Sequence, residues 1–219
     1  MPEPSPFRDG ARAVAAVGIA VFGFGVSFGL LARSAGMGWL APIVMSATTF
    51  AGSSQFAAAS VLDAGGTVAA AIAAAVLLNA RYGPIGISVA PSMEGGVWSR
   101  LVRAQLIVDE TWAVSARGDG GFDVAKLTGA GLTLYAAWVV GTIVGVVFGS
   151  ALGDPSTLGL DAAFPALFLA LLIPHLRSRR AVLAALIGAA IALALIPIAP
   201  PGVPIVAAAL GTLVGVRRR

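Results

Sequence analysis

Long stretches without any charged residue constrain this chain more than any other feature of its sequence. No charged side chain occurs between Ser34 and Leu62, and further charge-free runs cover residues 127–153 and 181–216. A helix needs about 20 consecutive apolar residues to cross the hydrocarbon core of a bilayer, so each run is long enough to cross. Charged residues make up only 11% of the chain, whereas soluble domains contain about 25%. We therefore predict an all-α integral membrane protein.

The apolar runs predict a polytopic helix bundle of about seven or eight membrane segments. Prolines interrupt several of them, among them Pro84 and Pro197, so discontinuous helices are expected. Either the amphipathic stretch from Val97 to Ala116 crosses the membrane, which gives eight segments, or one segment of the chain is re-entrant, which gives seven. A polar loop after this stretch separates two candidate halves, residues 13–116 and 127–216.

The distribution of arginines predicts how the chain is oriented. Residues 1–12 are expected to form a cytoplasmic N-terminal tail, and residues 13–219 a single transmembrane domain. The arginines of this tail, of residues 177–180 and of residues 217–219 should all be cytoplasmic by the positive-inside rule, which puts both termini on that side. Arg33 would then lie outside and does not fit the rule. Basic residues at segment ends indicate membrane orientation, with no expected nucleic-acid partner.

Two pairs of glycines predict close packing between helices. Gly25 and Gly29 are four residues apart, and so are Gly141 and Gly145. Small residues at this spacing form a helix face that lets another helix approach closely. The matching spacing in the two halves also suggests an internal repeat, an arrangement that many transporters share.

The stretch Ala47–Ala57 places small polar groups in the middle of the first charge-free run. It contains Ser53, Ser54 and Gln55. Lipid offers no hydrogen-bond partner to a hydroxyl or an amide, so these groups must face other helices or a water-filled cavity. We predict that all three bind substrate in one wall of a cavity. The alternative is that they only allow two helices to pack closely.

A second anomaly lies inside the third apolar segment. Pro84 has no N–H to offer the carbonyl of Ala80, so the helix is expected to break there. Arg81 lies beside the break, where burial costs about 3 kcal/mol on insertion scales and therefore requires a partner or water. We predict that Asn79 and Arg81 bind substrate. Alternatively, Arg81 extends to the membrane interface beside Tyr82.

Two adjacent acids follow the apolar residues 106–108. Asp109 and Glu110 are candidates for proton coupling, because carboxylates within a membrane are usually functional. The alternative interpretation is that they end a helix in solvent.

The residue inventory argues against an enzyme. The chain has no cysteine and a single histidine, His175, which we interpret as an interfacial residue. No zinc-protease, phosphate-loop or nucleophile-elbow motif occurs. We expect no catalytic residue, no metal site and no cofactor. A small zwitterion suits what remains, since an arginine can hold its carboxylate and nearby oxygens its ammonium group.

Four short motifs together resemble a known family. They are Phe50-Ala-Gly-Ser-Ser-Gln-Phe56, Asn79-Ala-Arg81, Asp109-Glu110 and Gly159-Leu-Asp-Ala-Ala-Phe-Pro-Ala-Leu-Phe168. In this order and spacing they are similar to the AzlC family of branched-chain amino acid permeases. The resemblance extends from about Gly23 to Arg180. Tyr82 departs from it, because the family pattern leads us to expect a histidine after the Asn-x-Arg motif.

The resemblance implies a function and a partner. It implies transport, mostly export, of branched-chain amino acids or their analogues across the bacterial inner membrane, together with a small AzlD-type membrane subunit. Our leading hypothesis is a secondary amino acid exporter subunit. A structural or assembly subunit and an uncoupled channel for small solutes are the alternatives.

Overall fold

The computed structural model describes residues 5–149, 169, 172–173, 176–200 and 203–211. Within these residues the regular structure is helical, as the apolar composition predicts, and the one β-bridge joins Ala116 to Phe122. The helices are α1 (Pro6–Ala13), α2 (Ala15–Ser34), α3 (Leu40–Thr49), α4 (Gly52–Asp63), α5 (Val68–Asn79), α6 (Tyr82–Val89), α7 (Val97–Ala104), α8 (Asp109–Ser115), α9 (Val124–Phe148), α11 (Arg179–Leu195) and α12 (Val203–Ala208), with a 3-10 turn η1 at Ala90–Ser92.

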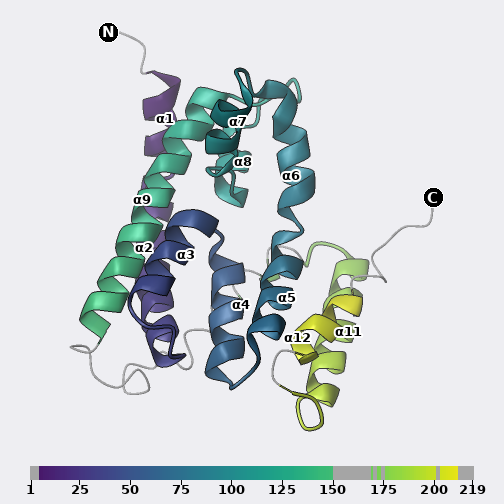
Figure 1. Ribbon diagram of the computed structural model, residues 1–219. Helices are drawn as coiled ribbons and strands as arrows, with labels where there is room; N and C mark the ends of the chain where they lie inside the picture. Colours follow the sequence, from purple (N-terminus) through teal and green to yellow (C-terminus); the bar gives the residue numbers. More distant parts are fainter. Residues whose placement is uncertain (1–4, 150–168, 170–171, 174–175, 201–202, 212–219) are drawn as a thin grey trace.

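Helices α2 and α9 form the most extensive helix contact in the described part of the chain and lie along one side of it, next to α3 (Figure 1). Their contact is nearly backbone to backbone: a Cβ added at Gly29 would lie 2.6 Å from the carbonyl oxygen of Thr142, and one at Gly145 would lie 2.1 Å from that of Val26. Gly25 and Gly141 meet in the same way. The two predicted glycine faces therefore pack against each other. The internal repeat inferred from them stays a prediction.

The segment treated as a tail in the sequence contains helix α1. It continues the line of α2 along the first turns of α9 (Figure 1). Glycines again allow the contact, because a Cβ at Gly10 would lie 2.0 Å from the carbonyl oxygen of Lys126, and one at Gly129 would lie 1.9 Å from that of Phe7. At least residues 6–12 are thus packed on the bundle.

The charge-free run from Ser34 to Leu62 does not form one crossing helix, contrary to expectation. Helix α3 ends at Thr49, Phe50 adopts a left-handed conformation with φ of 43°, and α4 then runs back. The side chain of Asp63, at the end of α4, accepts a hydrogen bond of 3.1 Å from Ser34, at the end of α2. Both ends of the segment therefore lie at the same end of the bundle. We call residues 40–63 the apolar hairpin (Figure 1).

The third apolar segment is broken, as predicted. Helices α5 and α6 together are long and apolar enough for one crossing, and they are bent by 41° at Ala80–Arg81. Pro84 lies at the third position of α6 and has no N–H to donate to the carbonyl of Ala80. This carbonyl instead accepts a bond of 3.1 Å from the N–H of Gly83, three residues ahead, so the turn is narrower than an α-helical turn. The break thus precedes the proline by three residues.

The amphipathic stretch forms a second hairpin. Its two helices have eight and seven residues, too few to cross a bilayer. The backbone N–H of Phe122, beyond its end, donates to the hydroxyl of Ser92, before its start, over 3.1 Å. The segment therefore returns to the end of the bundle from which it came, and the crossing alternative for residues 97–116 is not what the structure shows. We call residues 97–115 the amphipathic hairpin.

In the described part of the chain, two helices, α2 and α9, are long and apolar enough to cross a membrane, or three with the bent pair. Helix α11 ends before Pro197 and α12 starts after Pro200, so the last charge-free run is split as predicted. The motif at 159–168 and His175 lie outside the described residues. The count of seven or eight segments stays a prediction.

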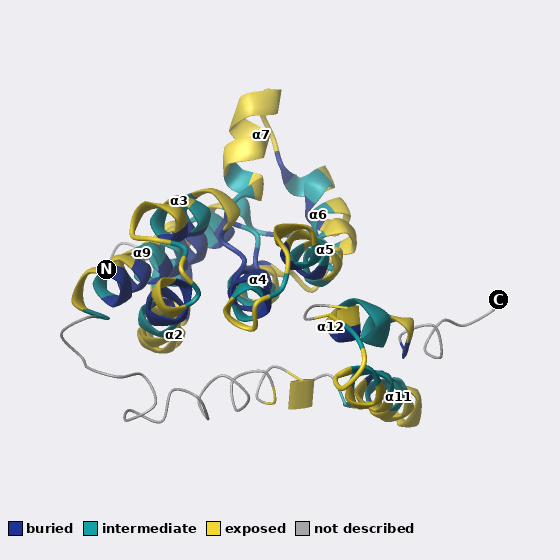
Figure 2. Cartoon of the chain, turned by 60° about the horizontal axis from the view of Figure 1, so that its bottom comes forward, coloured by how far each residue is buried: buried dark blue, intermediate teal, exposed yellow. Residues whose placement is uncertain are grey.

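Burial differs sharply between the elements. Helix α4 lies inside the bundle, and most of its residues are buried, whereas α7 projects from the bundle and has no buried residue (Figure 2). The main cluster of buried side chains joins α2, α4 and α9 through Phe28, Phe56 and Trp138. This cluster forms the base on which the candidate site is built.

Candidate functional site

Three interruptions of helical structure meet beside α2 and α9. They are the tip of the apolar hairpin at Phe50–Ala51, the break at Ala80–Arg81, and the tip of the amphipathic hairpin at Val108. The side-chain amide of Gln105 donates to the carbonyl of Thr48 over 2.7 Å, so the two hairpins touch near their tips. The hairpins come from opposite ends of the bundle and stop at the same depth (Figure 1).

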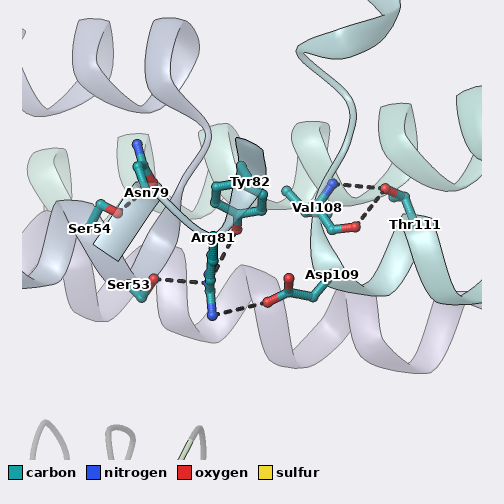
Figure 3. A network of polar contacts seen from close by, with 8 residues as sticks. All are labelled: Ser53, Ser54, Asn79, Arg81, Tyr82, Val108, Asp109 and Thr111. Carbon is teal, nitrogen blue, oxygen red and sulfur yellow. Dashed lines mark hydrogen bonds and ion pairs between the residues drawn. The ribbon is translucent and has the colours of Figure 1, made fainter. Parts of the chain in front are cut away.

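Arg81 connects all three interruptions. One terminal nitrogen forms an ion pair of 3.1 Å with the carboxylate of Asp109, and the other donates to the hydroxyls of Ser53, over 3.1 Å, and Tyr82, over 3.2 Å. The guanidinium also lies 5.1 Å from the centre of the Tyr82 ring. Figure 3 shows Arg81 between Ser53 and Asp109. This arginine thus has the partners that its position inside an apolar bundle requires.

The N-termini of two helices are directed at the same place. Helix α4 begins at Gly52 and α8 at Asp109, so the first N–H groups of each helix and the positive end of its dipole lie beside Arg81. Asp109 and Glu110 occupy the first turn of α8, where a negative charge is favourable. The local field therefore suits a carboxylate next to Arg81.

Thr111 fixes the tip of the amphipathic hairpin. Its buried hydroxyl accepts a bond of 2.9 Å from the N–H of Val108 and lies 2.9 Å from the carbonyl oxygen of Leu106, to which it donates. Figure 3 shows the Val108 contact immediately beside Asp109. This local network holds the start of α8, and hence the carboxylate of Asp109, in position.

A cavity of about 150 Å³ lies where these elements meet. Its polar end is formed by Ser53, Arg81, Asp109 and Glu110. The remaining wall is apolar or aromatic and is contributed by α2, by both hairpins, by the start of α6 and by α9; it comprises Val17, Ala20, Val21, Phe24, Phe50, Gly52, Phe56, Tyr82, Val108, Leu134 and Trp138. Such a cavity can hold a small molecule that has one charged end and one apolar end.

The surroundings of Glu110 affect its protonation. It lies in α8, outside the candidate spans. Desolvation by the surrounding atoms raises the pKa of its carboxyl above the ordinary 4.5; a backbone hydrogen bond opposes this, the charge of Asp109 adds to it, and Arg81 opposes it. Although the surface of Glu110 is exposed to solvent, the atoms around its carboxyl keep this pKa above the ordinary value, so the group holds its proton to higher pH than a glutamate in a free peptide does.

A comparison with known protein families identifies the family of this chain. A family model described as AzlC protein matches residues 16–152. The chain belongs to the AzlC family. The match confirms the resemblance carried by the sequence motifs.

Three relatives share most of their length with this AzlC-family chain. An uncharacterized membrane protein of Archaeoglobus fulgidus is 34% identical and aligns with 84% of this chain and 82% of its own. The inner membrane protein YgaZ of Escherichia coli is 26% identical over 86% of this chain and 83% of its own. The branched-chain amino acid transport protein AzlC of Bacillus subtilis is 29% identical over 78% and 68%. No solved structure matches.

The predicted site residues separate into two groups in this AzlC-family structure. Ser53, Arg81, Asp109 and Glu110 line the cavity. Ser54 and Asn79 do not line it; the hydroxyl of Ser54 donates to the side-chain oxygen of Asn79 and so joins α4 to the end of α5 (Figure 3). Asn79 instead borders an adjoining hollow with Gln105.

Gln55 is buried behind the cavity wall and does not line it. Its oxygen accepts bonds from the N–H of Ala51, over 3.1 Å, and from the indole of Trp138, over 3.0 Å. Its nitrogen donates to the hydroxyl of Ser46 over 2.9 Å. The amide has protein partners at both its atoms, so the polar stretch satisfies part of its hydrogen-bonding capacity within the bundle.

Sequence reasoning missed Trp138, which lines the cavity from α9. The signal available was its spacing: Trp138 lies three residues before Gly141, which places it on the same face of α9 as the glycines that contact α2. An aromatic residue on a packing face would have been assigned to the core. Phe24 and Phe56 were missed for the same reason.

Proposed function

We propose that this chain is the transport subunit of a secondary transporter for branched-chain or other small apolar amino acids, with export as its direction. The observation that carries the proposal is the arrangement of one arginine, two carboxyl groups and a hydroxyl at the end of an otherwise apolar cavity. An amino acid with an apolar side chain has the complementary distribution of charge.

The polar end offers a partner to each charge of a zwitterion. Arg81 has more donors than partners, since its Nε has no hydrogen-bond partner among the described residues. A substrate carboxylate would bind Arg81 and the start of α4 at Ser53, and the ammonium group would bind Asp109 or Glu110. The Arg81–Asp109 pair then exchanges one internal ion pair for two pairs with the substrate, so no charge is left without a partner.

The apolar wall matches a short hydrocarbon side chain. A dry cavity of about 150 Å³ accommodates a molecule as large as benzene in another protein, which is comparable to the side chains of valine, leucine and isoleucine. The Bacillus subtilis relative is named as a branched-chain amino acid transport protein, which supports this substrate class.

We further propose an inner-membrane location with the end that carries α1 and α7 facing the cytoplasm. Basic residues at this end include Arg8, Arg12, Arg100, Arg103, Arg117 and Lys126 (Figure 1). Arg33 lies at the other end, in the last turn of α2 and next to Ser34, which donates to Asp63, as the orientation predicted from the sequence implies. The small AzlD-type subunit remains a proposed partner.

Proton coupling through Asp109 and Glu110 is part of the proposal. Both carboxyl groups line the cavity, and Glu110 holds a proton to higher pH than usual. Substrate bound to Arg81 would release Asp109 from its ion pair, which links substrate binding to the charge of this carboxylate. Tyr82, at the position where a histidine was expected, contributes a hydroxyl to Arg81.

The test is efflux of labelled leucine from preloaded cells and proteoliposomes that contain the chain together with its AzlD-type partner. We expect saturable flux in the wild type and a loss of at least about 10-fold in Arg81→Ala, because the substrate carboxylate loses its charged hydrogen-bond donor. Arg33→Ala is the matched control, since Arg33 lies outside the cavity. Absence of saturable flux in the wild type with the partner present would refute the proposal.

One observation bears on the alternative of an assembly subunit whose glycine faces bind a partner. Gly25, Gly29, Gly141 and Gly145 already contact one another inside this chain and have no room for another helix. If Arg81→Ala nevertheless abolishes complex formation with the partner, the assembly role is favoured. Flux that neither saturates nor depends on a proton gradient would favour the uncoupled channel.

A further inference from the structure

Trp138 forms a rigid part of the apolar wall of the cavity. It lies midway along α9, and 4% of its surface is exposed. Its ring lies against the first residue of α4, because a Cβ added at Gly52 would be 3.1 Å from its Cη2 atom. The ring stacks on Phe28 with centroids 5.7 Å apart and meets the edge of Phe56 at 6.1 Å. The indole is thus enclosed on several sides by neighbours from α2 and α4.

A closed circuit of hydrogen bonds fixes the orientation of this ring. The indole Nε1 donates to Gln55, Gln55 donates to Ser46 over 2.9 Å, and the hydroxyls of Ser46 and Thr142 lie 2.8 Å apart. Thr142 in turn donates to the backbone carbonyl of Trp138 over 2.9 Å, so Ser46 must be the donor to Thr142. The circuit begins and ends at Trp138.

Every side chain in this circuit is buried. If the ring rotated, the buried indole N–H would lose the bond that it makes to Gln55, and the amide oxygen of Gln55 would keep only the bond from the N–H of Ala51. The wall beside the cavity is therefore fixed in shape, in contrast to a wall of flexible aliphatic side chains.

We propose that Trp138 determines the largest side chain that the site accepts, and that Gln55 is a positioning residue that holds Trp138 in place. This inference rests on the proposed function, because it assigns the size limit of the same substrate site. It gives Gln55 a role through Trp138, consistent with its place behind the wall. A side chain larger than that of leucine would collide with an indole that cannot rotate away.

Two substitutions test the size limit in opposite directions. Trp138→Phe removes part of the ring and enlarges the cavity. Gly52→Ala introduces a methyl group 3.1 Å from the indole and narrows it. Gly52 does not have a positive φ, so alanine is compatible with its backbone. The readout is the ratio of inhibition constants of phenylalanine and leucine against labelled leucine transport.

We expect Trp138→Phe to shift this ratio by at least about 10-fold in favour of phenylalanine, the effect of one or two carbon atoms in an apolar pocket. Gly52→Ala should shift it the other way. Trp112→Phe is the matched control: it also removes an indole N–H bond, 2.9 Å to Ser88, but outside the cavity, and should leave the ratio unchanged.

Gln55→Met and Gln55→Glu test the positioning role. Methionine has a similar shape and removes both bonds to the oxygen, so the ratio should relax towards that of Trp138→Phe. A glutamate at this fully buried position is neutral, so it retains an acceptor for the indole and for Ala51 and an O–H to donate to Ser46, and it should keep the wild-type ratio. A purely structural role would lower stability in both variants without changing the ratio.

Thermal stabilisation of the purified complex by leucine and by phenylalanine provides a second readout that does not require flux. Wild-type ratios in Trp138→Phe and Gly52→Ala, with leucine still bound and transported, would overturn this inference and leave the proposed function intact. If leucine neither stabilises nor crosses the wild-type complex, the proposed function fails and the size limit fails with it.

Discussion

The two hairpins reach the same depth from opposite ends of the bundle, but they are held there by different means. Three side-chain hydrogen bonds attach the apolar hairpin to α9. Its buried Ser46 bonds to Thr142, and its buried Gln55 accepts a bond from Trp138. The hydroxyl of Tyr135 on α9 donates to the carbonyl of Ala47 over 2.8 Å. The apolar hairpin thus forms one unit with helices α2 and α9.

The amphipathic hairpin is held against α9 by apolar packing, and its side-chain hydrogen bonds to the rest of the chain go to other elements, among them one of 2.9 Å from the indole of Trp112 to the hydroxyl of Ser88 on α6. Leu106 packs on Gly131 of α9, and two polar contacts join the tip to the other interruptions, namely Gln105 to Thr48 and Asp109 to Arg81. Its first helix, α7, has no buried residue (Figure 2). The comparison indicates that the site has one fixed side and one side that can separate at a lower free-energy cost. The two carboxyl groups that line the cavity, those of Asp109 and Glu110, both belong to the amphipathic hairpin.

The largest expected difference is in hydrogen exchange. Backbone amides of residues 97–104 should exchange at least about 100-fold faster than those of residues 55–61, since local opening costs less where few apolar contacts are lost. Hydrogen-exchange mass spectrometry of the protein in nanodiscs measures both. Equal protection of the two segments would show that α7 is as firmly held as α4 and would remove the distinction.

The second-largest effect is expected when the attachment of the apolar hairpin to α9 is weakened. Thr142→Val removes the acceptor of Ser46 and opens the circuit around Trp138, at a cost of about 1 kcal/mol in unfolding free energy. Thr133→Val is its control, since that hydroxyl bonds only within α9, to the carbonyl of Gly129. Unfolding in detergent is the measurement. A similar loss in the two variants would mean that the contact to the apolar hairpin contributes nothing specific.

A smaller effect is expected on the pH dependence of transport, through Glu110 of the amphipathic hairpin. Because the pKa of Glu110 is raised, its carboxyl is neutral below that raised value and charged above it. Leucine flux in proteoliposomes should therefore change severalfold over a pH range above 4.5, the ordinary value, and Glu110→Gln should flatten this dependence. Glu94→Gln, outside the cavity, should keep it. A pH profile that survives in Glu110→Gln would assign the titration to another group.

The smallest effect is expected for Trp98 on α7. With 81% of its surface exposed, its replacement by alanine should change the unfolding free energy in detergent by less than about 0.5 kcal/mol. A loss above about 1 kcal/mol would mean that α7 packs against another surface in the protein.

Some of this structure could be predicted from the sequence because the responsible residues act locally. Pro84 cannot complete the helix ladder wherever it lies, so the break before it was predictable, and the spacing of Gly25 and Gly29 indicated a packing face without the partner being known. Arg81 could be expected to need a partner because of the cost of its burial. That Asp109 is this partner could not be predicted, because it depends on the hairpin fold of residues 97–115, and the sequence did not decide whether this stretch crosses the membrane.

The parts that were not predicted depend on distant contacts. Phe50 gave no sign of a chain reversal, because a left-handed conformation is unusual for a phenylalanine and is held here by tertiary packing, including its edge contact with Tyr135 at 5.2 Å. Gln55 illustrates the limit for the site. Its depth required a partner, but nothing in the sequence could distinguish a substrate from the indole of Trp138.

The packing of α2 on α9 has a consequence for how the protein is made. Helix α2 is synthesised early, and the helix that fills its glycine face is inserted only after both hairpins have left the ribosome. Until then α2 must remain in the bilayer with an open groove along its backbone, and the apolar hairpin lacks the hydrogen-bond partners that α9 supplies. Assembly of the substrate cavity is thus a late event, and a chain released before residue 148 would leave the groove of α2 unfilled and polar groups of the apolar hairpin without their partners in lipid.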